Sequence, residues 1–122
     1  MDESKIGTPP KPPYWPEEHV RVSVDPTGNL HYDRCCVHAH PGQVIRWHLD
    51  GRHAFAVIIK AFEGPLGWGY KTADRGETEI QGVVAHDARP GFYPYTLVAV
   101  HEDRLLVADP EIIIPPPRGG RA

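Results

Sequence analysis

Short apolar runs follow one another from residue 19 to residue 114, and no helical period persists among them. Valines alternate with polar residues in HVRVSVD, and the run ends at a turn sequence, Asp-Pro-Thr-Gly. Other runs end at the turn pairs Pro41-Gly42 and Asp50-Gly51. The pattern predicts seven to nine short strands, for which the candidate segments are residues 19–25, 35–40, 43–49, 54–62, 78–86, 91–101, 104–110 and 111–117.

Repeated short strands separated by turns are typical of an all-β sandwich. The segment 54–62 is almost wholly apolar, which predicts a strand buried on both sides. The segment 63–77 is rich in glycine, and we expect it to be irregular or to hold one helical turn. Alternation predicts the core residues Ile45, Trp47, Leu49, Phe55, Val57 and Ile59, together with Tyr93 or Tyr95.

Prolines crowd both ends of the chain and divide it into three parts. We expect a proline-rich arm over residues 1–18, the sandwich over 19–115 and a flexible tail over 116–122. The arm contains PPKPPYWP, which favours an extended polyproline conformation. Its Tyr14 and Trp15 either lie against the chain's own sandwich or dock in an aromatic-lined groove of a partner.

Composition narrows the classes of function. The net charge of −3 and the lack of a basic stripe argue against nucleic acid as a partner. No run of eighteen apolar residues and no signal-peptide pattern occurs, so we expect a cytoplasmic protein without a membrane span. The two cysteines are adjacent, where a disulfide would be strained, and we expect free thiols.

Three motifs, in this order, resemble the cupredoxin-like family: VHAHPGQVIRW, HAFAVII and ARPGFYPYTLVAV. The resemblance covers residues 20–114 and implies a Greek-key sandwich, with an immunoglobulin-like sandwich as the neighbouring possibility. In the copper-carrying members, a cysteine follows the tyrosine pair, a histidine comes three residues later, and a methionine usually follows. These three residues are copper ligands. Here those places hold Leu97 and Val100, and the only methionine is Met1. The resemblance therefore implies a member without a type 1 copper centre.

The sequence RCCVHAH concentrates soft metal ligands. If this segment is a strand, Cys36, His38 and His40 share one outer face, and Cys35 points inward. Alternate residues of a strand are spaced roughly 7 Å apart. His48 has the outward parity of the next predicted strand, and His53 lies near the family's first copper histidine. Cys36, His38, His40 and His53 are the candidate ligands for Zn, Cu or Ni. The alternative is that these side chains are solvated or hydrogen-bonded and that no cofactor is bound.

These observations favour a non-catalytic module that binds another protein, with a homo-oligomer left open. The candidate contact residues are aromatic: Tyr14 and Trp15 on the arm, and Trp68 and Tyr70 in the glycine-rich segment. Trp68 has an alternative role as a lid on the sandwich core. The rival functions are metal handling through residues 35–40 and, third, a small thiol-dependent enzyme that uses a Cys36–His38 pair.

Overall fold

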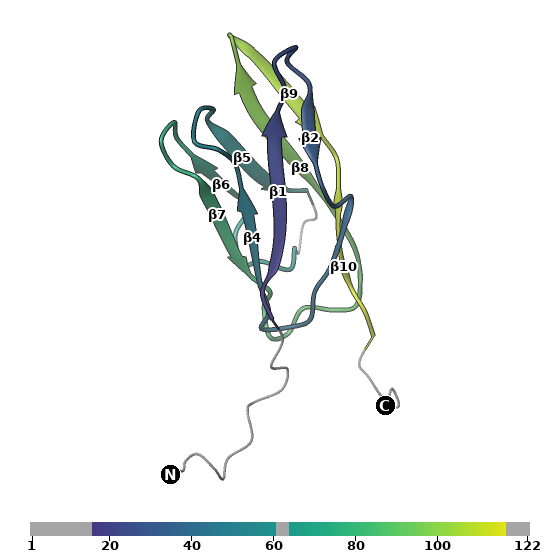
Figure 1. Cartoon of the computed structure of the whole chain (residues 1–122). Coiled ribbons are helices and arrows are strands. Elements are labelled where there is room, and N and C mark those ends of the chain that lie inside the picture. Colours follow the sequence, from purple (N-terminus) through teal and green to yellow (C-terminus); the bar gives the residue numbers. More distant parts are fainter. Residues whose placement is uncertain (1–15, 61–63, 117–122) are drawn as a thin grey trace, which may run out of the picture.

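Two β-sheets pack face to face in the computed structural model, which describes residues 16–60 and 64–116 (Figure 1). Within these ranges the chain forms ten strands, and no helix of a kind that could cross a membrane occurs there. The strands are β1 Glu18–Val24, β2 Leu30–Tyr32, β3 Cys36–His38, β4 Val44–His48, β5 Phe55–Ile59, β6 Tyr70–Ala73, β7 Glu79–Val83, β8 Gly91–His101, β9 Arg104–Ala108 and β10 Glu111–Ile114.

The first sheet has the order β2-β1-β4-β7, and the second has the order β3-β10-β8-β5-β6, with β9 paired to β8. The pairs β1–β4 and β3–β10 are parallel, and the others are antiparallel. Several consecutive strands, such as β4 and β5, lie in opposite sheets, as in the predicted Greek-key arrangement. The predicted all-β sandwich is therefore confirmed.

Two strands were not expected from the sequence. The three-residue β2 pairs with β1 across a turn that Asp25 stabilises, because its Oδ1 accepts hydrogen bonds from the backbone N–H groups of Thr27 and Asn29 at 3.0 and 2.9 Å. The prediction for the segment 63–77 was wrong in part, since β6 lies within it and pairs with β5. Its Tyr-Lys-Thr-Ala sequence is too short to show a strand period.

The core lies between the sheets and contains the residues predicted from alternation. Ile45, Trp47, Leu49, Phe55, Val57 and Ile59 are all buried, and of the two tyrosines Tyr95 is the buried one. Trp47 on the first sheet donates a hydrogen bond from Nε1 to the Tyr95 hydroxyl on the second sheet, at 3.0 Å. The two rings meet edge to face, with centroids 5.5 Å apart. This pair joins the two layers at the centre of the sandwich.

The expectation that residues 54–62 form a strand buried on both sides was wrong for the single chain. Phe55, Val57 and Ile59 point into the core, but Ile58 on the opposite face is 37% exposed. No element within the described ranges packs over that side of β5, because the second sheet has the first sheet on one face alone. An apolar strand with one open face needs a separate explanation.

Tyr95→Phe tests the central hydrogen bond. Burial raises the pKa of Tyr95 to about 12, so the hydroxyl remains protonated at neutral pH. Removing it leaves the buried Trp47 Nε1–H without a partner, which should lower the free energy of unfolding by about 1–3 kcal/mol. The matched control is Tyr93→Phe, which removes the hydroxyl that donates to the Arg89 carbonyl oxygen from a half-buried tyrosine. Urea unfolding should show the larger loss for Tyr95→Phe, and equal losses would contradict the role given to this pair.

Candidate functional site

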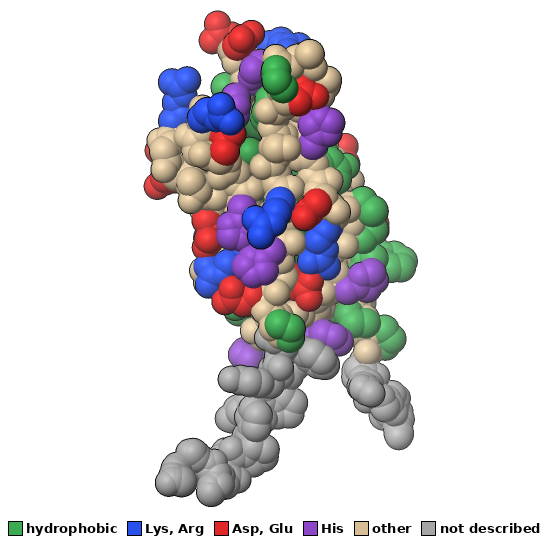
Figure 2. Space-filling model, viewed as in Figure 1, with side chains coloured by type: hydrophobic (Ala, Val, Ile, Leu, Met, Phe, Trp, Pro, Cys, Tyr) green, Lys and Arg blue, Asp and Glu red, His purple; other side chains and the backbone are tan. Residues whose placement is uncertain are grey.

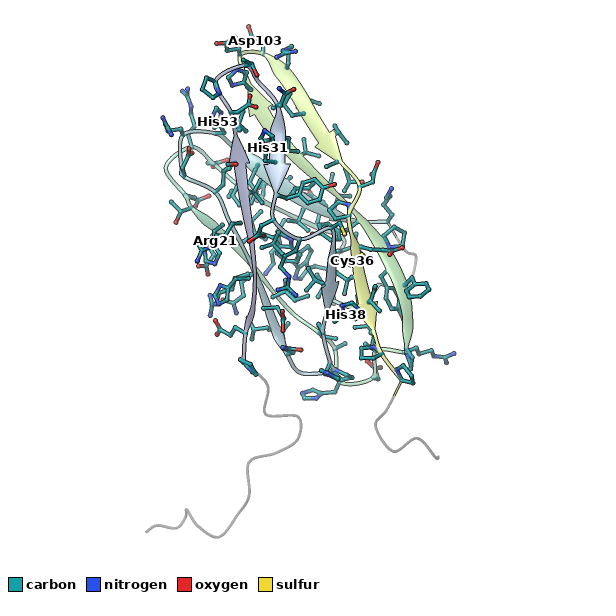
Figure 3. All side chains as sticks on the ribbon, turned by 45° about the vertical axis from the view of Figure 1, so that its right-hand side comes forward. Arg21, His31, Cys36, His38, His53 and Asp103 are labelled. Atoms are coloured by element: carbon teal, nitrogen blue, oxygen red, sulfur yellow. The ribbon has the colours of Figure 1, made fainter. Side chains whose placement is uncertain are left out.

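The predicted metal ligands do not form one cluster. Cys36 and His38 lie on β3, and His53 lies in the turn before β5 at the other end of the sandwich (Figure 3). Among the residues that the structure describes, no three His, Cys, Asp or Glu side chains are arranged to hold a metal ion. A metal site that uses Cys36, His38, His40 and His53 therefore stays a prediction.

The two thiols are free, and their sulfur atoms lie 3.5 Å apart. Cys35 is exposed, so the expectation that it points inward was wrong. The reason is that β3 begins at Cys36, and strand alternation does not extend to the residue before it. Two effects raise the pKa of the Cys36 thiol: the hydrogen bond to Cys35 is the larger one, and desolvation is the second. A raised pKa is opposite to what a thiolate nucleophile requires.

Leu97 and Val100, the positions at which the resemblance implies copper ligands, face opposite sides of β8. Leu97 is fully buried in the core, and Val100 is 39% exposed on the outer face. Residues 97–101 continue as a regular strand that pairs with β9 through residues 104–108. Hydrocarbon side chains on opposite faces of a strand supply no ligand set, so electron-transfer chemistry of the type 1 kind has no basis at these positions.

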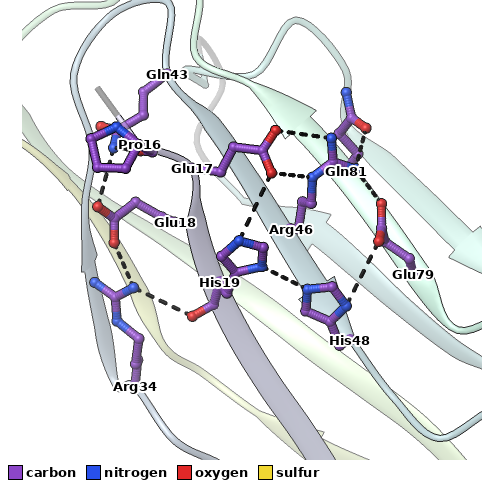
Figure 4. Close-up of polar contacts among 10 residues, drawn as sticks. All are labelled: Pro16, Glu17, Glu18, His19, Arg34, Gln43, Arg46, His48, Glu79 and Gln81. Atoms are coloured by element: carbon purple, nitrogen blue, oxygen red, sulfur yellow. Dashed lines mark hydrogen bonds and ion pairs between the residues drawn. The ribbon is translucent and has the colours of Figure 1, made fainter. Parts of the chain in front are cut away.

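The outer face of the first sheet is charged (Figure 2), and several of its charged side chains are paired with one another. Arg46 on β4 lies at the centre of this network and binds Glu17, Glu79 and the side-chain oxygen of Gln81 (Figure 4). The Arg46 guanidinium holds the pKa of the Glu17 carboxyl below its usual range. Glu18 binds Arg34 at 2.5 Å and Gln43 at 3.1 Å.

Two histidines stack on the same face of the first sheet. His19 Nδ1 and His48 Nε2 lie 2.8 Å apart, and the ring planes are inclined by 15° (Figure 4). Desolvation lowers the pKa of His48. A hydrogen bond between two imidazoles requires that one of the two facing nitrogens, His19 Nδ1 or His48 Nε2, carries no proton. Together with the Arg46 network, it links side chains of β1, β4 and β7 to one another on this face.

A cleft of about 1090 Å³ lies at the end of the sandwich formed by the turns after β1, β4, β6 and β8. Its lining mixes both signs of charge, and several of these groups are already paired. Arg52 binds Asp50 at 3.0 Å, and Asp25 binds His31 at 2.8 Å. His53 Nδ1 donates a hydrogen bond to the Val100 carbonyl oxygen, at 3.0 Å, which holds the imidazole in place. The cleft carries no consistent chemistry for one ligand class.

The predicted aromatic contact residues divide into two groups. Tyr14 and Trp15 lie outside the described residues. Trp68 packs edge to face on Trp47, with centroids 6.5 Å apart, and the Lys71 ammonium lies 5.0 Å from its ring centroid. This placement agrees with the alternative role as a lid on the core. Tyr70 is different, because it lies on β6 and is 68% exposed.

Tyr70 belongs to an apolar surface that the sequence analysis missed. Of the seven exposed large hydrophobic residues among those described, six lie on the outer face of the second sheet, as the strand registers show. They are Ile58, Tyr70, Phe92, Val100, Leu105 and Val107. We call this surface the apolar face. The seventh residue, Val83, lies on the first sheet.

No protein-family model and no curated protein matches the chain. Solved structures similar to it include a mutant of amicyanin in its reduced Cu(I) form at pH 4, with 14% identity over 83% of this chain and 86% of that chain, at a TM-score of 0.48. Another amicyanin mutant with Cu(I) has 14% identity over 79% of this chain and 81% of that chain, at a TM-score of 0.48. A pseudoazurin from Sinorhizobium has 20% identity over 83% of this chain and 76% of that chain, at a TM-score of 0.44. The copper in the amicyanin structures is a property of those proteins.

Alkylation of Cys36 tests the state of the thiol pair. We expect the pH midpoint for reaction of Cys36 with iodoacetamide, mapped by mass spectrometry, to lie above the value of about 8.5 for a free thiol. In Cys35→Ala the midpoint should move down, because the neighbouring thiol is the largest cause of the raised pKa. A midpoint below that of a free thiol would instead support the rival function, a thiol-dependent enzyme.

Proposed function

We propose that this protein is a non-catalytic binding module that contacts another protein chain through the apolar face of its second sheet. The observation that carries the proposal is the gathering of six exposed large hydrophobic residues on one face. Monomeric soluble proteins rarely expose a contiguous apolar patch of more than a few hundred Å². Patches above that size mark interaction sites. The aromatic contact predicted at Tyr70 is part of this surface.

The contrast between the two sheets supports the proposal. The outer face of the first sheet carries Glu17, Arg46 and Glu79 in an internal network of ion pairs. On the apolar face, the strand registers instead align β-branched and aliphatic side chains, with Val98 opposite Val107 and Val100 opposite Leu105. A charged, internally paired surface is well solvated, whereas an aliphatic one gains free energy when water is removed from it.

The chemistry of the thiols supports a non-catalytic role. The raised pKa of Cys36 keeps its thiol protonated at neutral pH, so its nucleophilicity is low. Metal handling has no comparable support, since the described residues provide no three-ligand group. Binding through a preformed apolar surface is the function that these observations favour.

Site-specific photo-crosslinking in the protein's native cells tests the proposal. A photoreactive phenylalanine analogue at Leu105 or Phe92 should form covalent adducts with another protein chain, because both side chains protrude from the apolar face, at 68% and 71% exposure. The matched control is the same analogue at Val83, which is 46% exposed on the first sheet. Adducts no more abundant at Leu105 and Phe92 than at Val83 would contradict the proposal.

A further inference from the structure

We infer that the partner on the apolar face is a second copy of this chain, related by a two-fold axis that runs along β8. The inference rests on the proposed function and names the partner that the apolar face fits. β8 is the centre of the second sheet, with β5 on one side and β9 and β10 on the other (Figure 1). A two-fold axis parallel to β8 exchanges these two sides, so β5 of one copy lies over β9 and β10 of the other.

Charge complementarity across this axis is the first argument. Lys60 and Glu111 flank Pro94 of β8 on opposite sides, since Lys60 N–H bonds to the Pro94 carbonyl and Glu111 is the register partner of Pro94. The two-fold axis therefore places Lys60 of each copy over Glu111 of the other. Asp109, which binds Lys60 within the chain at 3.0 Å, lies one row away and adds a second acceptor. Opposite charges face each other twice in the dimer.

Side-chain size is complementary as well. Ala54 and Ala56 lie beside Val100 and Val98 on one side of β8, and Leu105 and Val107 lie beside the same two residues on the other side. The axis places the large side chains of β9 over the small ones of β5. Alternation of large and small residues across facing sheets lets the layers interdigitate, as sheets packed about 10 Å apart require.

The area of the second sheet fits a small dimer interface. The strands β3, β5, β6, β8, β9 and β10 offer about 500 Å² of flat sheet, at about 3.3 Å per residue and about 4.8 Å between strands. This is below the about 800 Å² per partner of a standard interface and corresponds to a small interface of the kind found in weakly associating proteins.

The composition of β5 gives an independent reason. Its wholly apolar sequence, FAVII, is typical of strands that are covered on both faces, yet Ile58 is 37% exposed in the single chain. In the dimer, residues 107–111 of the second copy lie over β5 and cover that open face, with Asp109 in the row of Ile58. In the single chain β5 is covered on one face, whereas in the dimer it is covered on both.

Sedimentation equilibrium of the purified full chain, from micromolar to near-millimolar concentration, tests the inference. The expected result is a species of twice the 13.6 kDa chain mass. Val107→Glu should weaken the dimer about a hundredfold, because a carboxylate would be buried at the interface. The matched control, Val83→Glu on the first sheet, should leave it unchanged. A wild-type chain that stays monomeric throughout would overturn the inference.

A charge swap separates contacts between copies from contacts within a chain. Lys60→Glu and Glu111→Lys should each weaken the homodimer about tenfold, since each places two like-charged pairs across the axis. Mixed one to one, the two variants should form a heterodimer close to the wild type in affinity, detectable by native mass spectrometry. Mixing without any gain in association would overturn the arrangement.

The outcomes also separate this inference from the proposed function. Adducts from Leu105 to a different protein, together with a monomeric purified chain, would overturn the second copy and leave the binding module intact. A monomeric chain without adducts at Leu105 or Phe92 would overturn both.

Discussion

The alternation of side chains along β8 is the constraint on which the rest of the structure depends. Over eleven residues this strand sends Tyr95, Leu97 and Ala99 into the core and Val98 and Val100 to the opposite face. The same strand therefore holds the two layers together, through the contact of Tyr95 with Trp47, and forms the centre of the apolar face. Since successive residues of a strand face opposite sides, the Leu97 side chain that fills the core cannot also contribute to the outer surface.

The sequence predicted most of the fold because alternation and turn signals are local. Trp47 and its neighbours were correctly placed in the core, and the Asp-Gly and Pro-Gly pairs marked turns. The β6 strand was missed because its four residues between glycine-rich stretches show no period. Cys35 was placed on the wrong side because alternation was extended past the end of β3.

The apolar face was missed for a different physical reason. In GFYPYTLVAV and RLLVADP both faces of the strand are apolar, and such a run is equally consistent with burial by the chain itself or by a partner. Which face remains open depends on how the strands are ordered in the two sheets, and periodicity carries no information on that order. Tyr70 was predicted as a contact residue because it is an aromatic residue in a segment expected to be an irregular loop, although it lies on a strand. Its role in the apolar face follows from register with Ile58.

The central claim is that a second copy of the chain covers the apolar face. The most direct measurement compares two valines of similar exposure, Val107 at 57% and Val83 at 46%, by the broadening of their methyl NMR signals in the presence of a soluble paramagnetic agent. At concentrations where the chain self-associates, we expect the Val107 methyls to be protected and the Val83 methyls to broaden. Equal broadening of the two signals at every concentration would contradict the account.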